Sequence, residues 1–411
     1  MRILLMTDSP FIPSGQARVG REIAVGLAAR GHQIGYLGWW HNPNITPNLP
    51  YNIQFWWTND GMYGSNILDK VVNSFQPEIL LTIGDFWNLA YITEPITCRT
   101  RKYFQWCSYI PVDGEPHGGG LSPGIADVIA EVDIPVAYTN YAKDAVLKSI
   151  QDQETRNRIS VIYHGVDTKI FKPLDPAARR KMRESYGIDD KFIFLTVCRN
   201  QTRKNIPELF KAWRKFIDIP GIMDNVILWP HMNFRDTSGW NIDDLINIYG
   251  FKERSVMYYD QMAHPQHDKF GIPETELAAL YQMADAFILL SNEGFGLPTL
   301  EAMATRLPCI LLNHSASGEL GIDGRALLVK PEGNLTWIGR YLTEKPIPGE
   351  DASVDAMVKV FSNKKLRDET ASKGYEFAIK NTWDSVLDEW NALFLSYEMP
   401  FLKSMKMEVV V

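Results

Sequence analysis

The chain has 411 residues, of which 45% are apolar and 22% are charged, and its formal net charge is −7. This length exceeds the roughly 250–300 residues at which a single core stops growing, so two domains are expected, and the composition excludes collagen-like and disordered chains. The apolar runs are far shorter than the ~18 residues of a membrane span, and the net charge gives no reason to seek nucleic acid. Four cysteines without metal-binding spacing and no secretion signal favour a cytoplasmic protein.

Short apolar runs alternate with helical patterns along the first part of the chain. A helix is predicted from about Gln16 to Arg30. This alternation is typical of a parallel sheet built from strand–helix–strand units. The predicted strands cover residues 2–7, 33–40, 52–57, 78–83, 102–110, 135–139 and 159–163.

The pattern restarts beyond a proline-containing segment at 166–175, which favours a domain boundary there. We therefore predict the α/β class, with two Rossmann-like, doubly wound parallel-sheet domains at 1–170 and 171–382. The second series of strands is predicted at 192–198, 226–230, 255–259, 286–291, 309–312 and 326–329, with helices at 206–216, 274–283 and 299–305.

The residues after each strand matter most, because ligands of open parallel sheets collect beyond the carboxyl ends of the strands. Ser14 and Gly15 lie between the first strand and its helix, where a helix N-terminus suits a phosphate. The familiar nucleotide motifs do not fit, because Gly15-x4-Gly20 is followed by Arg21 and Glu22 instead of Lys and Ser/Thr. A simple turn at Gly15 is the alternative.

A second loop, after the strand predicted at 192–198, carries three cations: Arg199, Arg203 and Lys204. A helix follows them, and its dipole disfavours positive charge at its N-terminus. The arrangement makes more sense if an anion such as a diphosphate binds there. A solvated basic loop is the alternative.

Residues 291–302 read SNEGFGLPTLEA and turn the chain through Gly294 and Gly296. Pro298 suits the first turn of the following helix. Glycines let a ligand approach the backbone closely, so a phosphate could be bound by amides without a cationic side chain. The amides in question belong to Phe295, Gly296 and Leu297.

Two carboxylates, Glu293 and Glu301, flank this turn. Carboxylates are good acceptors for vicinal hydroxyls, so one could bind a sugar and the other a ribose. The alternative is a capping carboxylate and a surface helix glutamate.

The spacing Glu293-x7-Glu301 around Gly294-Phe295-Gly296-Leu297-Pro298 resembles the donor site of the retaining GT-B glycosyltransferases of glycosyltransferase family 4. Arg199 and Lys204 are similar to that family's diphosphate-binding pair. His164-Gly165-Val166-Asp167 is similar to its interdomain strand, and Gly15 to its glycine loop.

This resemblance implies two domains facing a central cleft, in which a nucleotide-diphosphate sugar is the co-substrate, with no metal and no other cofactor. Glu301 would bind the ribose, Glu293 the transferred sugar, and Arg199 with Lys204 the leaving diphosphate, aided by the amides of 295–297. The C-terminal segment at about 383–411 would cross back as a helix that completes the first domain, and the cleft would close about 166–175.

One departure from the family concerns the histidine that many members place at the sugar. Here the strand predicted at 102–110 leads to Asp113, which occupies that position, while His117 is a second candidate. A carboxylate near the reacting carbon could stabilise a positively charged transition state. We therefore count Asp113 with Glu293, Arg199 and Lys204 as catalytic candidates.

Several questions stay open at this point. A GT-B sugar-nucleotide epimerase or phosphorylase, or a non-catalytic glycan-binding descendant, is the alternative function. The acceptor could be a glycan, a lipid-linked glycan, a protein or a modified DNA base, and the oligomeric state is open. His264 and His267 are interpreted as a solvated loop. Six tryptophans, some of which could form an acceptor platform, lie early in the chain: Trp39, Trp40, Trp56, Trp57, Trp87 and Trp106.

Overall fold

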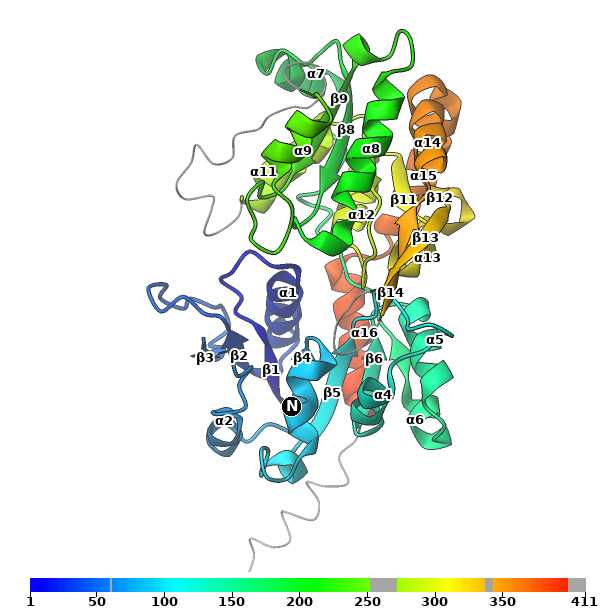
Figure 1. The fold of residues 1–411 in the computed structure, drawn as a ribbon. Coiled ribbons are helices and arrows are strands. Elements are labelled where there is room, and N and C mark those ends of the chain that lie inside the picture. The colour runs from blue at the N-terminus through cyan, green and yellow to red at the C-terminus, as the bar shows by residue number, and fades with distance from the viewer. Residues whose placement is uncertain (60, 252–271, 337–342, 398–411) are drawn as a thin grey trace, which may run out of the picture.

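The computed structural model describes residues 1–59, 61–251, 272–336 and 343–397, and it shows two lobes, each built on a parallel sheet (Figure 1). The first sheet has the order β3-β2-β1-β4-β5-β6-β7, with every neighbouring pair parallel. Its strands are β1 (Arg2–Asp8), β2 (Gln33–Trp39), β3 (Gln54–Thr58), β4 (Ile79–Ile83), β5 (Gln105–Ile110), β6 (Ile134–Ala137) and β7 (Ser160–Val161).

The second sheet has the order β12-β11-β10-β8-β9 and is also parallel throughout. The predicted α/β class with two Rossmann-like domains is thus confirmed, whereas the domain limits stay a prediction. The strand predicted at 255–259 lies outside the described residues. The strands are β8 (Phe192–Val197), β9 (Val226–His231), β10 (Ala286–Leu289), β11 (Cys309–Leu312) and β12 (Ala326–Val329).

Helices connect the strands, and local sequence signals account for several of their ends. The Ser14 hydroxyl caps α1 by accepting from the amide of Ala17, and Pro298 lies in the first turn of α12. The first lobe contains α1 (Gly15–Ala29), α2 (Leu68–Phe75), α3 (Phe86–Leu89), α4 (Pro123–Ala130), α5 (Asn140–Ser149) and α6 (Gln153–Arg158). The later helices are α7 (Pro176–Ser185), α8 (Ile206–Ile217), α9 (Ile242–Ile248), α11 (Glu274–Met283), α12 (Leu297–Ala304), α13 (Ser315–Gly321), α14 (Glu350–Ser362), α15 (Lys364–Ala378) and α16 (Trp383–Ser396).

The central strands are buried on both faces, because helices cover both sides of each sheet. In β1, Ile3 and Leu5 belong to one apolar cluster, while Leu4 and Met6 belong to another. This alternation follows from the two-residue period of a strand. The cluster that contains Ile3 continues through Phe171 to the second sheet, so the two lobes share apolar packing along the linker.

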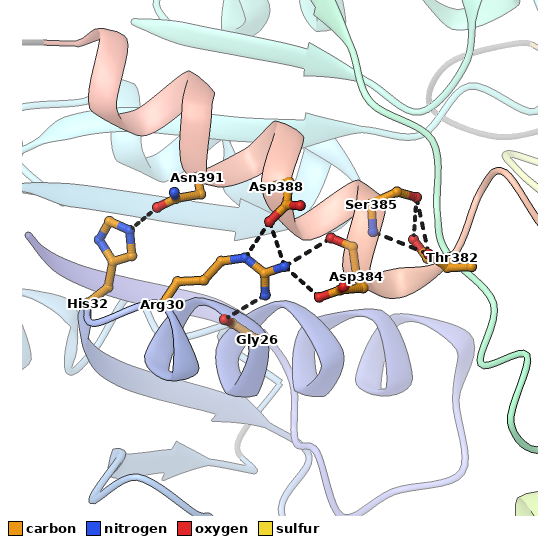
Figure 2. A network of polar contacts seen from close by, with 8 residues as sticks. All are labelled: Gly26, Arg30, His32, Thr382, Asp384, Ser385, Asp388 and Asn391. Carbon is orange, nitrogen blue, oxygen red and sulfur yellow. Dashed lines mark hydrogen bonds and ion pairs between the residues drawn. The ribbon is translucent and has the colours of Figure 1, made fainter.

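Helix α16 crosses back to the first lobe, where it lies beside α1 (Figures 1 and 2). The guanidinium of Arg30 donates to Asp388 at 2.7 Å and to Asp384 at 2.8 Å, and the His32 ring lies 2.8 Å from the Asn391 amide oxygen. A Cβ atom at Gly26 would overlap the Leu387 side chain. The predicted crossover helix is therefore present, and glycine permits its close approach.

The sequence does not predict the antiparallel hairpin formed by β13 (Pro331–Thr336) and β14 (Glu344–Pro348). This hairpin reaches the first lobe, because the amide of Glu344 donates to the carbonyl oxygen of Glu115 at 2.9 Å. It is thus a second connection between the lobes.

Strand order reverses between β1 and β4 in the first sheet and between β8 and β10 in the second. Such switch points are where doubly wound sheets bind ligands. A cleft of about 2570 Å³ lies there, lined by residues that follow all four of these strands. Among the described helices, none combines the length and apolar character that crossing a membrane requires.

Candidate active site

The centre of the cleft on the second lobe is an ion pair between Lys204 and Glu293. The Lys204 Nζ atom lies 2.5 Å from Glu293 Oε1, and the Ser291 hydroxyl donates to the same oxygen. Burial is the main cause that lowers the pKa of Lys204, and the charge of Arg203 lowers it further. Burial would raise the pKa of Glu293, but the charges of Lys204 and Arg203 lower it. Two candidates from distant loops therefore meet as charged groups.

Asp113 approaches this pair from the first lobe and contacts two cations. Its Oδ2 lies 3.3 Å from Arg203 Nη1, and its Oδ1 accepts from the ammonium of Lys345 in β14. Burial alone would raise the pKa of Asp113, but the charges of Lys345 and Arg203 bring it to about 2. The carboxylate is therefore ionised at neutral pH and cannot serve as a general acid there.

Arg199 behaves differently from its two basic neighbours. Its side chain is 63% exposed, and its Nε atom donates to Asp236 at 2.9 Å. Each of the three cations thus has a carboxylate partner: Asp236 for Arg199, Asp113 for Arg203 and Glu293 for Lys204. Because these carboxylates already reduce the repulsion among the cations, that repulsion is a weaker argument for a bound anion than it was in the sequence. Arg199 and Lys204 do line one cleft, as expected.

The glycine turn delivers the N-terminus of α12 to the cleft. Gly296 has a φ of 98°, in the region that favours glycine, and Gly294 lies against Pro111 of the first lobe. Among the described residues, no group accepts a hydrogen bond from the backbone amides of Phe295, Gly296 or Leu297. A Cβ atom at Gly15 would lie 4.0 Å from Leu297, so the two predicted phosphate-facing loops meet across the cleft.

Glu301 is buried at the edge of this site, and both of its oxygens have partners. One accepts from the Arg18 guanidinium of α1, and the other accepts from the Tyr281 hydroxyl at 2.8 Å. Arg18 also lies 3.2 Å from Glu274 of α11. The glutamate predicted to bind ribose therefore also links the two lobes.

The first lobe contributes two further carboxylates, Asp8 at the end of β1 and Asp85 just after β4. Asp8 accepts from the Ser14 hydroxyl at 2.5 Å, and burial raises its pKa. Burial, and then the charge of Asp113, raise the pKa of Asp85 to about 7. Both residues follow strands at the switch point, a signal that could have identified them.

The histidines noted in the sequence differ in where they lie. The His117 side chain is 95% exposed, lies 3.2 Å from Glu344 and does not line the cleft. His164 lines the cleft, but burial lowers its pKa to about 3, and its Nδ1 lies 2.8 Å from the Tyr109 hydroxyl. His264 and His267 are outside the described residues.

Comparison with known proteins gives a family match over part of the chain. Residues 266–377 match the family described as "Glycosyl transferases group 1". A relative from Mycolicibacterium smegmatis, "GDP-mannose-dependent alpha-(1-6)-phosphatidylinositol monomannoside mannosyltransferase", is 28% identical over 218 residues, 47% of this chain and 51% of the relative. The chain spans about half the length of the curated relatives it matches.

Solved structures match over nearly the whole chain. Sucrose-phosphate synthase from Thermosynechococcus elongatus has a TM-score of 0.73 at 17% identity, covering 96% of this chain and 98% of that one. Anabaena Alr3699/HepE, solved in complex with UDP and glucose, has a TM-score of 0.70 at 16% identity, covering 96% and 100%. These similarities show that the chain has the GT-B fold.

Proposed function

We propose that this protein is a retaining glycosyltransferase that moves a sugar from a nucleotide-diphosphate sugar to an acceptor hydroxyl. The observation that carries the proposal is the meeting of Lys204, Glu293 and the amides of 295–297 at one switch point, opposite Asp113; in the described part of the chain these amides have no acceptor. The matched family and the similarity to glycosyltransferases support the same activity.

In the proposed reaction, the bond between the anomeric carbon and the diphosphate breaks while the acceptor oxygen attacks from the same face. Arg199, Lys204 and the amides of 295–297 stabilise the charge that grows on the leaving diphosphate, which is the largest catalytic effect available here. The diphosphate takes the proton from the acceptor hydroxyl, so no protein nucleophile is needed.

The glutamates and Asp113 position the sugar nucleotide in this scheme. Glu301 accepts from the ribose hydroxyls and Glu293 from hydroxyls of the transferred sugar. Asp113, ionised beside Lys345 and Arg203, stabilises positive charge at the reacting carbon. Because cations and amides balance the charge of the diphosphate, we propose that the reaction needs no metal. We also propose that the protein acts in the cytoplasm.

Incubation with a panel of nucleotide sugars, including UDP-glucose and GDP-mannose, tests this proposal. Release of nucleoside diphosphate together with an acceptor-bound sugar of unchanged anomeric configuration is expected, at a rate that a chelator does not alter. A changed sugar nucleotide would identify an epimerase instead.

A variant then tests the role of Asp113. Asp113→Asn is expected to lose transfer far more than donor binding, because the lost charge acts on the transition state. Near-wild-type turnover with equal donor binding would remove Asp113 from the mechanism.

A further inference from the structure

The cleft wall that belongs to the first lobe presents aromatic rings to solvent. Trp40 and Trp87 both line the cleft and are 44% and 46% exposed. Their sequence neighbours behave as core residues, since Trp39 and Phe86 are buried. Large aromatic side chains exposed inside a cleft are typical of a recognition surface, because they offer apolar area that a ligand can cover.

The Trp40 ring packs against Tyr63, which also contacts the residue that follows Trp87. Tyr63 packs edge-on against Trp39 and Trp40, with ring centroids 5.2 and 5.6 Å apart, and its hydroxyl bonds the side chain of Asn88. Asn88 follows Trp87 directly in α3. Trp40 also has a φ of 58°, a backbone conformation that bulky residues rarely adopt and that the surrounding structure must stabilise.

Carboxylates stand on this same wall, while most of the cationic groups that line the cleft come from the other lobe. Asp8 and Asp85 both line it, and within the described residues the Asp85 side chain makes no hydrogen bond. Of the first lobe's basic side chains at the cleft, Arg18 and Arg21 are both paired with Glu274 of the second lobe.

We propose that this wall binds the acceptor as an uncharged sugar, whose C–H face covers Trp40 and Trp87 and whose hydroxyls are bound by Asp85 and Asp8. The inference rests on the proposed transferase function. Neighbouring hydroxyls of a sugar are donors that carboxylates accept, and the ring face is apolar enough to stack on tryptophan.

The charges of the wall argue against acceptors that carry negative charge. Asp113 is paired with Lys345 and Arg203, but Asp8 and Asp85, when ionised, would repel a phosphate or a carboxylate carried by the acceptor. A modified base within DNA brings a chain of phosphates with it, and DNA binding depends on basic side chains that neutralise them. The raised pKa of Asp85 lets its carboxyl group either donate to or accept from a sugar hydroxyl near neutral pH.

An acceptor panel tests the inference through the release of nucleoside diphosphate above the acceptor-free rate. The panel contains neutral disaccharides, an alkyl glycoside of the same sugar, a sugar phosphate, a uronic acid and DNA with hydroxymethylated bases. The neutral sugars are expected to accelerate release, and the alkyl glycoside distinguishes a lipid-linked source from a free one. Acceleration by the DNA or the charged sugars alone would overturn the inference.

Tryptophan variants locate the binding surface. Trp40→Ala and Trp87→Ala are each expected to raise the KM for the neutral acceptor about tenfold, and by more than they lower kcat, because a ring contact is lost. Trp40→Phe keeps a ring and should recover part of that loss. Trp57→Ala is the matched control, because Trp57 is 40% exposed but does not line the cleft.

Measuring sugar binding directly tests this inference separately from the transferase proposal. Saturation-transfer NMR with the neutral disaccharides is expected to show contact that Trp40→Ala and Trp87→Ala weaken and Trp57→Ala does not. If sugars bind in this way but no donor is consumed, the transferase proposal fails while the sugar site stands. If transfer occurs and the tryptophan variants keep the wild-type KM and NMR signal, the sugar site is wrong while the transferase proposal stands.

Discussion

Replacing Asp85 by Asn is expected to make the protein more stable at alkaline pH and to leave it nearly unchanged at acidic pH. Burial and the charge of Asp113 raise the pKa of Asp85 from its ordinary 3.8 to about 7 in the folded protein. Between these values the unfolded chain has released a proton that the folded chain retains. The free energy of unfolding of the wild type therefore falls as the pH rises from about 4 to about 7.

The size of the effect follows from the width of this window. About three pKa units at about 1.36 kcal/mol each give a penalty of about 4 kcal/mol above pH 7, which is an upper figure. An asparagine is neutral at every pH and avoids this penalty. Asp85→Asn is thus expected to gain about 2–4 kcal/mol relative to wild type at pH 8 and little at pH 4.5.

Urea unfolding at the two pH values measures this difference. Asp190→Asn is the matched control, because this residue is exposed and a hydrogen bond from Lys191 lowers its pKa, so the variant should show no gain in stability at pH 8. Asp113→Asn removes the charge that acts on Asp85, so the wild-type penalty should shrink in that background. Parallel pH profiles for wild type and Asp85→Asn would show that Asp85 titrates normally, and the electrostatic description of this wall would then be wrong.

Two further predictions concern packing and the central ion pair. Gly26→Ala should destabilise the protein by about 1–3 kcal/mol in thermal unfolding, because the added methyl overlaps Leu387. Gly124→Ala is the control: this residue lies in open space within α4, so the variant should gain a few tenths to about 1 kcal/mol. Equal shifts in the two variants would contradict the close packing of α16 on α1. Lys204→Met leaves the Glu293 carboxylate buried without its closest cation, so the free energy of unfolding should fall by about 3–5 kcal/mol and donor turnover should be lost. A stable and active variant would contradict the assigned pair.

Features encoded by neighbouring residues could be predicted from the sequence. The strands were located because apolar runs such as 79–83 are bounded by turn residues, and both sheets are parallel as the alternation indicated. The turn at Gly296 and the proline after it place the start of α12 within two residues of the prediction. In the tryptophan pairs at 39–40 and 56–57, the second ring is the more exposed, as strand alternation suggests.

Contacts between distant segments could not be predicted in this way. Arg18 and Glu301 are 283 residues apart, and Lys345 and Asp113 are 232 residues apart, yet each pair is in contact. Two prolines in β14, at 346 and 348, hide the strand that carries Lys345, because proline weighs against a strand in the interior of a sheet. A residue that contacts Asp113 in the candidate site therefore lies on a strand that the local sequence does not predict.

The partners of the cations decide how a diphosphate could be taken up. Lys204 has three N–H donors, and its ammonium contacts Glu293, so it can bind a phosphate oxygen while it keeps this buried partner. Arg199 must change partners, but its pair with Asp236 is largely exposed, and such pairs contribute only about 0–1 kcal/mol. Uptake of the donor is therefore expected to rearrange the exposed pair and to leave the buried pair in place. The cation that keeps its partner, Lys204, and the cation that exchanges its partner, Arg199, then come from one loop.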